Sequence, residues 1–252
     1  FQSKSATPKR DITGVDCATD PVQSIKEMFV NQVQEGRIQA GQCPAMRPVF
    51  LKPHGVAKGT FKVRADLPDD MKVGLFAGDA YPAWVRFSSD TLPSRNDWKT
   101  TCGIGIKLFD TPTPKIFGLP EETTFDFILQ NIDVFFVNTA KEFCDFTQLS
   151  LTDPAAFKKW LADHPRTQEI LDQMQTPVAS ALGISYWSCL PFAFGPTRYV
   201  KYKLAPATEM PPPTDQPTDP TYLAQDLERR LADSDQRFTF MVQFRTDPAT
   251  MP

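Results

Sequence analysis

Histidine is the scarcest residue here that could carry acid/base or metal chemistry, because the 252-residue sequence contains only His54 and His164. Two imidazoles cannot supply a three-histidine zinc site, and the sequence has neither an HExxH motif nor paired Cys/His spacing. His164 precedes Pro165 at a predicted helix boundary, which is typical of a surface turn. His54 leads an extended segment into a predicted strand, where Gly55 allows close backbone approach. His54 is therefore the candidate catalytic residue, with a hydrogen-bonded strand-edge histidine as the plain alternative.

Other patterns that carry chemistry are incomplete. Gly103-Ile104-Gly105 lacks the third glycine and the following helix of a dinucleotide site, and there is no GxSxG or CxxCH motif. The five cysteines show no CxxC spacing, and an odd number cannot pair completely within the chain. Reduced thiols and one or two disulfides both remain open, and so does the choice between a cytoplasmic and a periplasmic or secreted location.

The amino-acid composition limits the classes of protein to which this chain can belong. Hydrophobic residues make up 41% and charged residues 23%, as in a soluble globular protein with a real core. The net charge of −3 excludes a strongly basic nucleic-acid binder. No apolar run approaches the roughly 20 residues of a transmembrane helix, so we expect none. The sequence begins at Phe1 rather than Met, so we expect that residues precede it.

Hydrophobic periodicity and the positions of glycine, proline and helix-capping residues predict the elements that must position His54. Residues 1–20 read as an N-terminal arm, and a helix capped by Asp20 runs until Gly36. Residues 37–53 read as an extended arm, and residues 205–220, with six prolines, as a loop. Strands are predicted at 55–64, 83–88, 102–109, 124–129, 134–137, 186–187, 199–204 and 237–244, and further helices at 140–150, 154–163, 165–175 and 222–232. We expect a single domain over residues 1–252.

Five segments together resemble the haem catalases. They are His54-Gly55-Val56-Ala57-Lys58-Gly59-Thr60-Phe61, Val85-Arg86-Phe87-Ser88, Gly103 to Phe109, Asp126 to Asn131 followed by Phe135-Phe136-Val137 and Phe143, and Tyr199 to Leu204. Their order and spacing agree over about residues 50–245. The short loops resemble the compact catalase-related branch, which includes small haem peroxidases and allene oxide synthases. The resemblance implies an α+β, mainly β fold: a closed antiparallel barrel with helices packed outside, holding haem b.

The resemblance also implies roles for single residues. His54 would take a proton from hydroperoxide and return it to the departing oxygen, and Asn131 would orient the peroxide, with Gln130 as the gapless alternative. Arg86 would pair with a haem propionate, Ser88 would hydrogen-bond the imidazole, and Phe143 would stack on the porphyrin.

The sequence departs from the family at three places. Leu51 stands where larger catalases have a second haem-contacting arginine, and Pro53 precedes His54 where catalases carry valine and allene oxide synthases threonine. The family's proximal tyrosine helix is absent, so we expect a truncated catalase-like domain whose iron ligand is unknown. Arg198 and Tyr202 mimic the proximal Arg-x-x-x-Tyr pattern, but the segment reads as a strand, so we do not take Tyr202 as the iron ligand.

The implied function is a haem-dependent peroxidase or weak catalase acting on hydrogen peroxide or an organic hydroperoxide. Rearrangement of a fatty-acid hydroperoxide and a haem-free binding module are the alternatives, and a homo-oligomer is left open. Without the proximal helix we expect haem to bind this chain weakly or not at all, and an apolar cleft to stand open beside His54.

Overall fold

The computed structural model describes residues 14–112, 115 and 122–247. Contacts divide these residues into two compact units. The described residues of one unit fall within 1–49 and 135–173, and those of the other fall within 50–134 and 174–252. The single domain stays a prediction, and most of the expected N-terminal arm lies outside the described residues.

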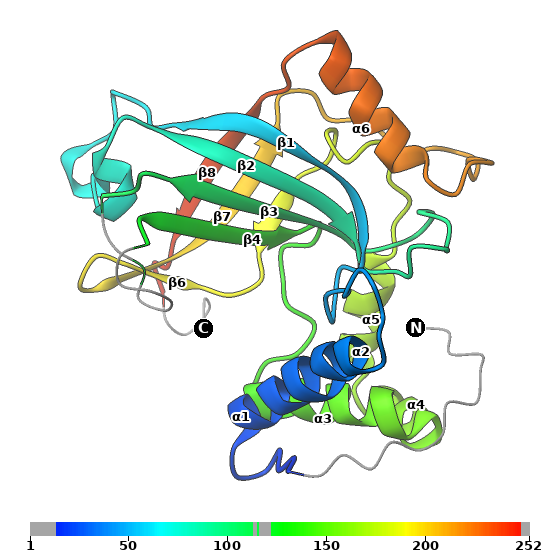
Figure 1. The fold of residues 1–252 in the computed structure, drawn as a ribbon. Helices are drawn as coiled ribbons and strands as arrows, with labels where there is room; N and C mark the ends of the chain where they lie inside the picture. The colour runs from blue at the N-terminus through cyan, green and yellow to red at the C-terminus, as the bar shows by residue number, and fades with distance from the viewer. Residues whose placement is uncertain (1–13, 113–114, 116–121, 248–252) are drawn as a thin grey trace. The chain divides into compact units, whose positions relative to one another are not determined.

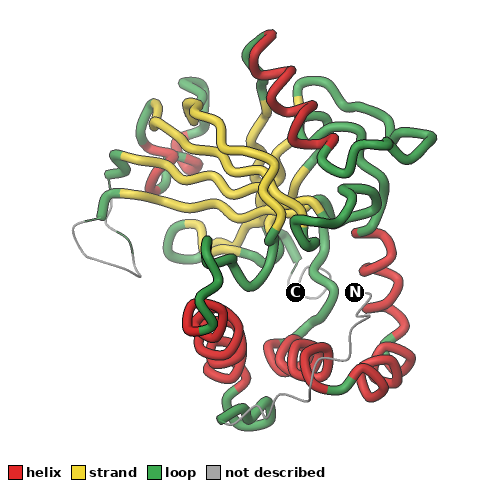
Figure 2. The backbone as a smooth tube through the Cα atoms, turned by 45° about the vertical axis from the view of Figure 1, so that its right-hand side comes forward, coloured by secondary structure: helices red, strands yellow, loops and turns green. Residues whose placement is uncertain are grey.

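The second unit is built on one antiparallel sheet (Figures 1 and 2). Hydrogen bonds join the strands in the order β1-β2-β3-β4-β5-β7, with β6 also paired to β7 and β8 added along it. The strands are β1 (Lys52–Lys62), β2 (Ala80–Ser89), β3 (Cys102–Phe109), β4 (Thr124–Gln130), β5 (Tyr186–Ser188), β6 (Phe192–Phe194), β7 (Arg198–Pro206) and β8 (Phe238–Phe244). The predicted antiparallel arrangement is confirmed, and the predicted strand at residues 134–137 is wrong because these residues form a loop.

The sheet is curled, and its hydrogen-bonded ladders begin at β1 and end at β8. Among the described residues no ladder joins these two strands, so closure of the expected barrel is not part of the observed pairing. Alternate residues of β2, β3 and β4 point into one apolar core. Phe87, Ile104, Leu108 and Phe127 are buried there together with Tyr202 of β7.

Helix α6 (Tyr222–Asp233) packs on β1 in this unit (Figure 1). Its apolar residues Leu223 and Leu227 are buried in the sheet core. The contact is close because β1 has a glycine at that point: a Cβ on Gly55 would lie 2.9 Å from Leu227 Cδ2. Helix α6 therefore covers the strand beside His54. The short turns η2 (Asp69–Met71) and η3 (Gly74–Ala77) connect β1 to β2.

The first unit is helical. Helix α1 (Pro21–Lys26) begins where the Asp20 side chain accepts from Gln23 N, as predicted. It continues through a π-helical segment η1 (Glu27–Glu35) into α2 (Gly36–Gln39), so the predicted stop at Gly36 is wrong. Helices α3 (Ala140–Thr152), α4 (Pro154–Asp163) and α5 (Pro165–Met174) follow, close to their predicted bounds.

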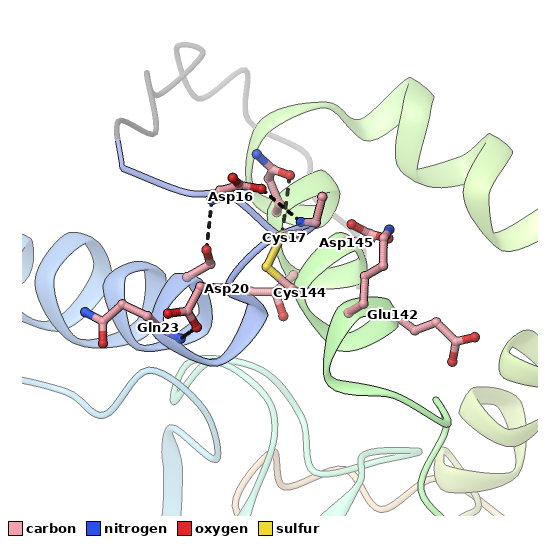
Figure 3. Close-up of a disulfide and its surroundings, with 12 residues drawn as sticks. Asp16, Cys17, Asp20, Gln23, Glu142, Cys144 and Asp145 are labelled. Carbon is pink, nitrogen blue, oxygen red and sulfur yellow. Dashed lines mark hydrogen bonds and ion pairs between the residues drawn. A yellow bond between two sulfur atoms is a disulfide. The ribbon is translucent and has the colours of Figure 1, made fainter.

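A disulfide between Cys17 and Cys144 ties the segment before α1 to α3 (Figure 3). Both cysteines are buried, and Val15 and Ile25 pack against them together with Met28. Of the two options left open for the cysteines, the structure thus takes the one with a disulfide. The remaining cysteines, Cys43, Cys102 and Cys189, are free thiols.

Removing this disulfide is expected to destabilise the helical unit. The bridge closes a loop with a sequence separation of 127 residues, which restricts the unfolded chain strongly. The double substitution Cys17→Ser and Cys144→Ser should lower the free energy of unfolding by roughly 2–5 kcal/mol in urea denaturation. The exposed Cys43→Ser variant is the matched control and should change stability by less than about 0.5 kcal/mol. Equal midpoints for the two variants would contradict the expectation.

Candidate active site

His54 lies at a bulge in β1. The register against β2 runs from Pro53↔Ser88 directly to Gly55↔Phe87, which leaves His54 as the extra residue. A bulge re-aims the side chain of the extra residue, and proline before it cannot donate to the ladder in any case. The imidazole is fully buried, and its Nε2 lies 2.8 Å from Ser89 Oγ.

A buried ion pair stands on the other side of the imidazole. Lys52 Nζ lies 2.7 Å from Asp97 Oδ1, and both side chains are buried. The ammonium also donates to the carbonyl oxygens of Arg95 and Pro220, each at 2.6 Å. Asp97 Oδ2 accepts from Leu223 N at the start of α6 (3.2 Å) and lies 3.9 Å from His54 Nδ1. The pair therefore links β1, the β2–β3 connection and α6 around His54.

Burial holds the pKa of His54 below its usual 6.5, at about 4. The negative charge of Asp97 opposes this change, whereas the positive charges of Lys52 and Arg86 add to it. His54 is consequently neutral at pH 7. A neutral imidazole can accept a proton, although a lowered pKa makes it a weaker base.

The hydroxyl group that contacts the imidazole is Ser89, so the expected hydrogen bond from Ser88 is wrong. The bulge is the cause, because it turns the His54 ring to the face of β2 that carries Ser89. Ser88 instead accepts from Arg86 Nη1 at 2.8 Å. Ser89 Oγ also lies 3.7 Å from the thiol of Cys102, whose pKa is raised to about 12 by burial.

Arg86 lies on the opposite face of the sheet. It alternates with Val85 and Phe87, which point to the core. Its guanidinium donates to Phe50 O at 2.9 Å as well as to Ser88. The predicted propionate-binding group and the predicted acid/base group therefore reach different faces.

The predicted peroxide-orienting amide is engaged in the sheet. Asn131 Oδ1 accepts from Cys102 N, and Asn131 N donates to Cys102 O, both at 3.0 Å. These bonds extend the β3–β4 ladder by one residue. Gln130, the gapless alternative, is buried, and its Nε2 has no hydrogen-bond partner. It shares the face of Ser88, because both residues pair with Gly103.

Phe143 belongs to the helical unit, where it lies in a cluster of aromatic rings. Its ring centroid is 5.4 Å from that of Phe135, 5.9 Å from Phe136 and 6.0 Å from Phe29. The haem-stacking role of Phe143 stays a prediction.

The expected open cleft beside His54 is wrong for this structure, because the imidazole has no exposed surface. A pocket of about 250 Å³ lies elsewhere and holds none of the predicted site residues. Its walls are Leu182, Ala207, Thr208, Met210, Ser234, Asp235, Gln236 and Arg237. Within the described part of the chain, no group of three His, Cys, Asp or Glu side chains could hold a metal ion. No helix in that part is long and apolar enough to cross a membrane.

Solved structures that match this fold include catalases. A fungal catalase matches with a TM-score of 0.63 and 18% identity over 85% of this chain and 46% of its own. Catalase A from Saccharomyces cerevisiae matches with a TM-score of 0.63 and 17% identity, over 84% of this chain and 47% of its own. A bacterial catalase matches with a TM-score of 0.61 and 16% identity, over 96% of this chain and 48% of its own. The chain therefore has the catalase fold, and it spans about half the length of these catalases.

Sequence comparison identifies a relative of a more specific class than the fold comparison does. The chain is 28% identical over 218 residues to a catalase-related peroxidase from Mycolicibacterium paratuberculosis, which covers 81% of this chain and 66% of that protein. No family model matches the sequence. The chain is thus a distant homologue of a catalase-related peroxidase, and the resemblance found in the sequence is confirmed.

In this arrangement, the residues expected to contact haem do not fit a porphyrin. The imidazole of His54 is sealed between Ser89 and Asp97, and Arg86 lies on the other face of the sheet. A site for haem would require His54 to become uncovered.

Proposed function

We propose that this protein is a peroxide-processing oxidoreductase of the catalase-related peroxidase type, acting on hydrogen peroxide or an organic hydroperoxide. The similarity to a catalase-related peroxidase over 81% of the chain carries the proposal. The catalase fold of the sheet supports it, and haem b is the cofactor that the family implies.

In this proposal His54 is the acid/base group. It is neutral at pH 7, so it can accept the hydroperoxide proton on one ring nitrogen and return it to the departing oxygen. The proposal requires a conformation in which His54 is reached from outside. Helix α6 covers the strand at Gly55 and donates a hydrogen bond from Leu223 N to Asp97, so in this proposal the helix moves away to uncover the ring.

A haem-free binding module with the catalase fold is the second candidate. The observation that favours it is the closed cluster around His54, whose polar atoms are directed at one another. Under this candidate, His54 is a buried structural residue and the chain turns over no peroxide.

Peroxide turnover dependent on His54 separates the two candidates. In protein that has been loaded with haem and separated from unbound haem, peroxide-dependent oxidation of an aromatic reductant should proceed, and His54→Ala should lower the rate per bound haem roughly 10²–10⁴-fold. His54→Gln keeps an amide for Ser89 but cannot act as a base, so it should lose the same activity.

The other histidine provides the matched control. His164→Ala, in the helical unit, should leave turnover unchanged. Turnover per bound haem no greater than that of free haem, or equal turnover per bound haem in His54→Gln and the unsubstituted protein, would overturn the proposed enzyme and favour the binding module.

A further inference from the structure

The surroundings of the His54 ring determine whether its nitrogen Nδ1 carries a proton. His54 Nδ1 is buried without a hydrogen-bond partner, and Asp97 Oδ2 faces it at 3.9 Å. A ring N–H directed at a carboxylate is attracted to it, whereas a bare nitrogen lone pair is repelled. At this distance the contact is electrostatic and not a hydrogen bond.

The remaining contacts are consistent with a proton on Nδ1. Nε2 is then an acceptor, and Ser89 Oγ lies at hydrogen-bond distance to donate to it. Ser89 Oγ can in turn accept from the thiol of Cys102, which burial keeps protonated. The donors of Cys102 and Ser89 thus each meet an acceptor, and the Nδ1–H of His54 faces the Asp97 carboxylate at 3.9 Å. The opposite tautomer would turn the bare Nδ1 toward the carboxylate.

Burial is the main reason that the imidazole stays neutral beside a carboxylate, and the positive charge of Lys52 adds to it. The Lys52 ammonium lies 2.7 Å from Asp97 Oδ1 and neutralises the charge that would otherwise favour an imidazolium. Leu223 N holds the second carboxylate oxygen, so Asp97 is fixed from β1 and from α6. The other ionisable groups near the cluster are Arg86 on β2, Cys102 on β3 and Tyr222 on α6.

We propose that the buried Lys52–Asp97 pair is a positioning element for His54, which holds the imidazole neutral with its proton on Nδ1 and presents a bare Nε2 to Ser89. Asp97 and Lys52 act through His54 and are not catalytic residues. The inference deepens the proposed function and rests on it for its purpose, because a base must keep a ring nitrogen free of a proton. Its test does not depend on peroxide or haem.

The test is imidazole NMR of the full chain labelled with ¹⁵N-histidine, without haem. Only two histidines contribute, and His54→Gln assigns their signals. Nε2 couples to both carbon-bound ring protons, whereas Nδ1 couples strongly to one, so the spectrum identifies the protonated nitrogen. The expected result is a neutral His54 ring protonated on Nδ1 that titrates near pH 4. A proton on Nε2 in the unsubstituted chain would overturn the proposal.

Substitution of the cation tests the role of Lys52. Lys52→Met should raise the pKa of His54 by more than about one pH unit, because an imidazolium then replaces the ammonium opposite Asp97. Adding Asp97→Asn should return the pKa to its low value. Lys62→Met, on the exposed end of the same strand, is the matched control and should leave His54 unchanged.

A Lys52→Met chain that folds and still titrates near pH 4 would refute the proposal. If that variant does not fold, the tautomer of the unsubstituted chain decides the matter alone. These outcomes are separate from the proposed function: loss of turnover in His54→Gln tests the enzyme, whereas the ring protonation state tests the positioning pair.

Discussion

Titration of the 252-residue chain with haem is expected to give weak binding or none, without the five-coordinate high-spin spectrum of a tyrosinate-ligated iron. The iron ligand in the family is a tyrosinate, and Tyr202 is the first suspect for a substitute. Tyr202 lies among the rings of Phe127 and Phe240, where burial raises its pKa from 10 to about 12. Forming its anion is therefore about 10²-fold less favourable than for an exposed tyrosine.

Other tyrosines offer no better ligand. The hydroxyl groups of Tyr81, Tyr186 and Tyr222 each donate to a backbone carbonyl oxygen, and burial raises the pKa of each. Tyr199 is exposed on β7, where it could not exclude water from a bound porphyrin.

Absorbance in the Soret region measures this binding. Tyr202→Phe should leave the titration curve unchanged, and Tyr199→Phe is the matched control on the same strand. Stoichiometric, tight binding with a five-coordinate high-spin spectrum would contradict the expectation. If that spectrum were lost in Tyr202→Phe alone, Tyr202 would be the replacement ligand.

Sequence patterns predicted most of the fold because local signals were strong. In residues 102–109, apolar side chains alternate with glycine or lysine, and polar residues flank the segment on both sides. Strand β3 has the predicted bounds. The apolar run at 134–137 was misleading because its phenylalanines pack in an aromatic cluster with Phe143 and do not join the sheet. Strand β6 was missed because the three residues between Pro191 and Gly195 are too few to show an alternation of apolar and polar side chains.

The candidate site was only partly predictable from sequence. His54 was identified by its scarcity and its segment, but the bulge that turns it toward Ser89 is a feature of strand pairing. Asp97 was missed because it lies in a polar loop that resembles any solvated turn. The weak signal that could have found it is Lys52, two residues before His54 at the start of a strand, where a buried lysine requires a carboxylate.

The second large effect is expected from removing one member of the buried ion pair. Lys52→Met leaves the carboxylate of Asp97 without its cation in a site shielded from water. The cost of an uncompensated buried charge is about 3–5 kcal/mol, so the free energy of unfolding should fall by that amount at pH 7. Urea denaturation followed by circular dichroism measures it.

A double-mutant cycle measures the interaction free energy between Lys52 and Asp97 separately from the effect of removing either side chain. Asp97→Asn alone should also destabilise the chain, whereas Lys52→Met together with Asp97→Asn should recover much of the loss, because no unpaired charge remains. Lys107→Met is the matched control: its partner Asp126 and Lys107 itself are partly exposed, so the change should be below about 1 kcal/mol. Additive losses in the double variant would mean that the two groups do not interact. A loss in Lys52→Met no larger than in Lys107→Met would mean that water reaches Asp97, and then His54 beside it would not be sealed from solvent either.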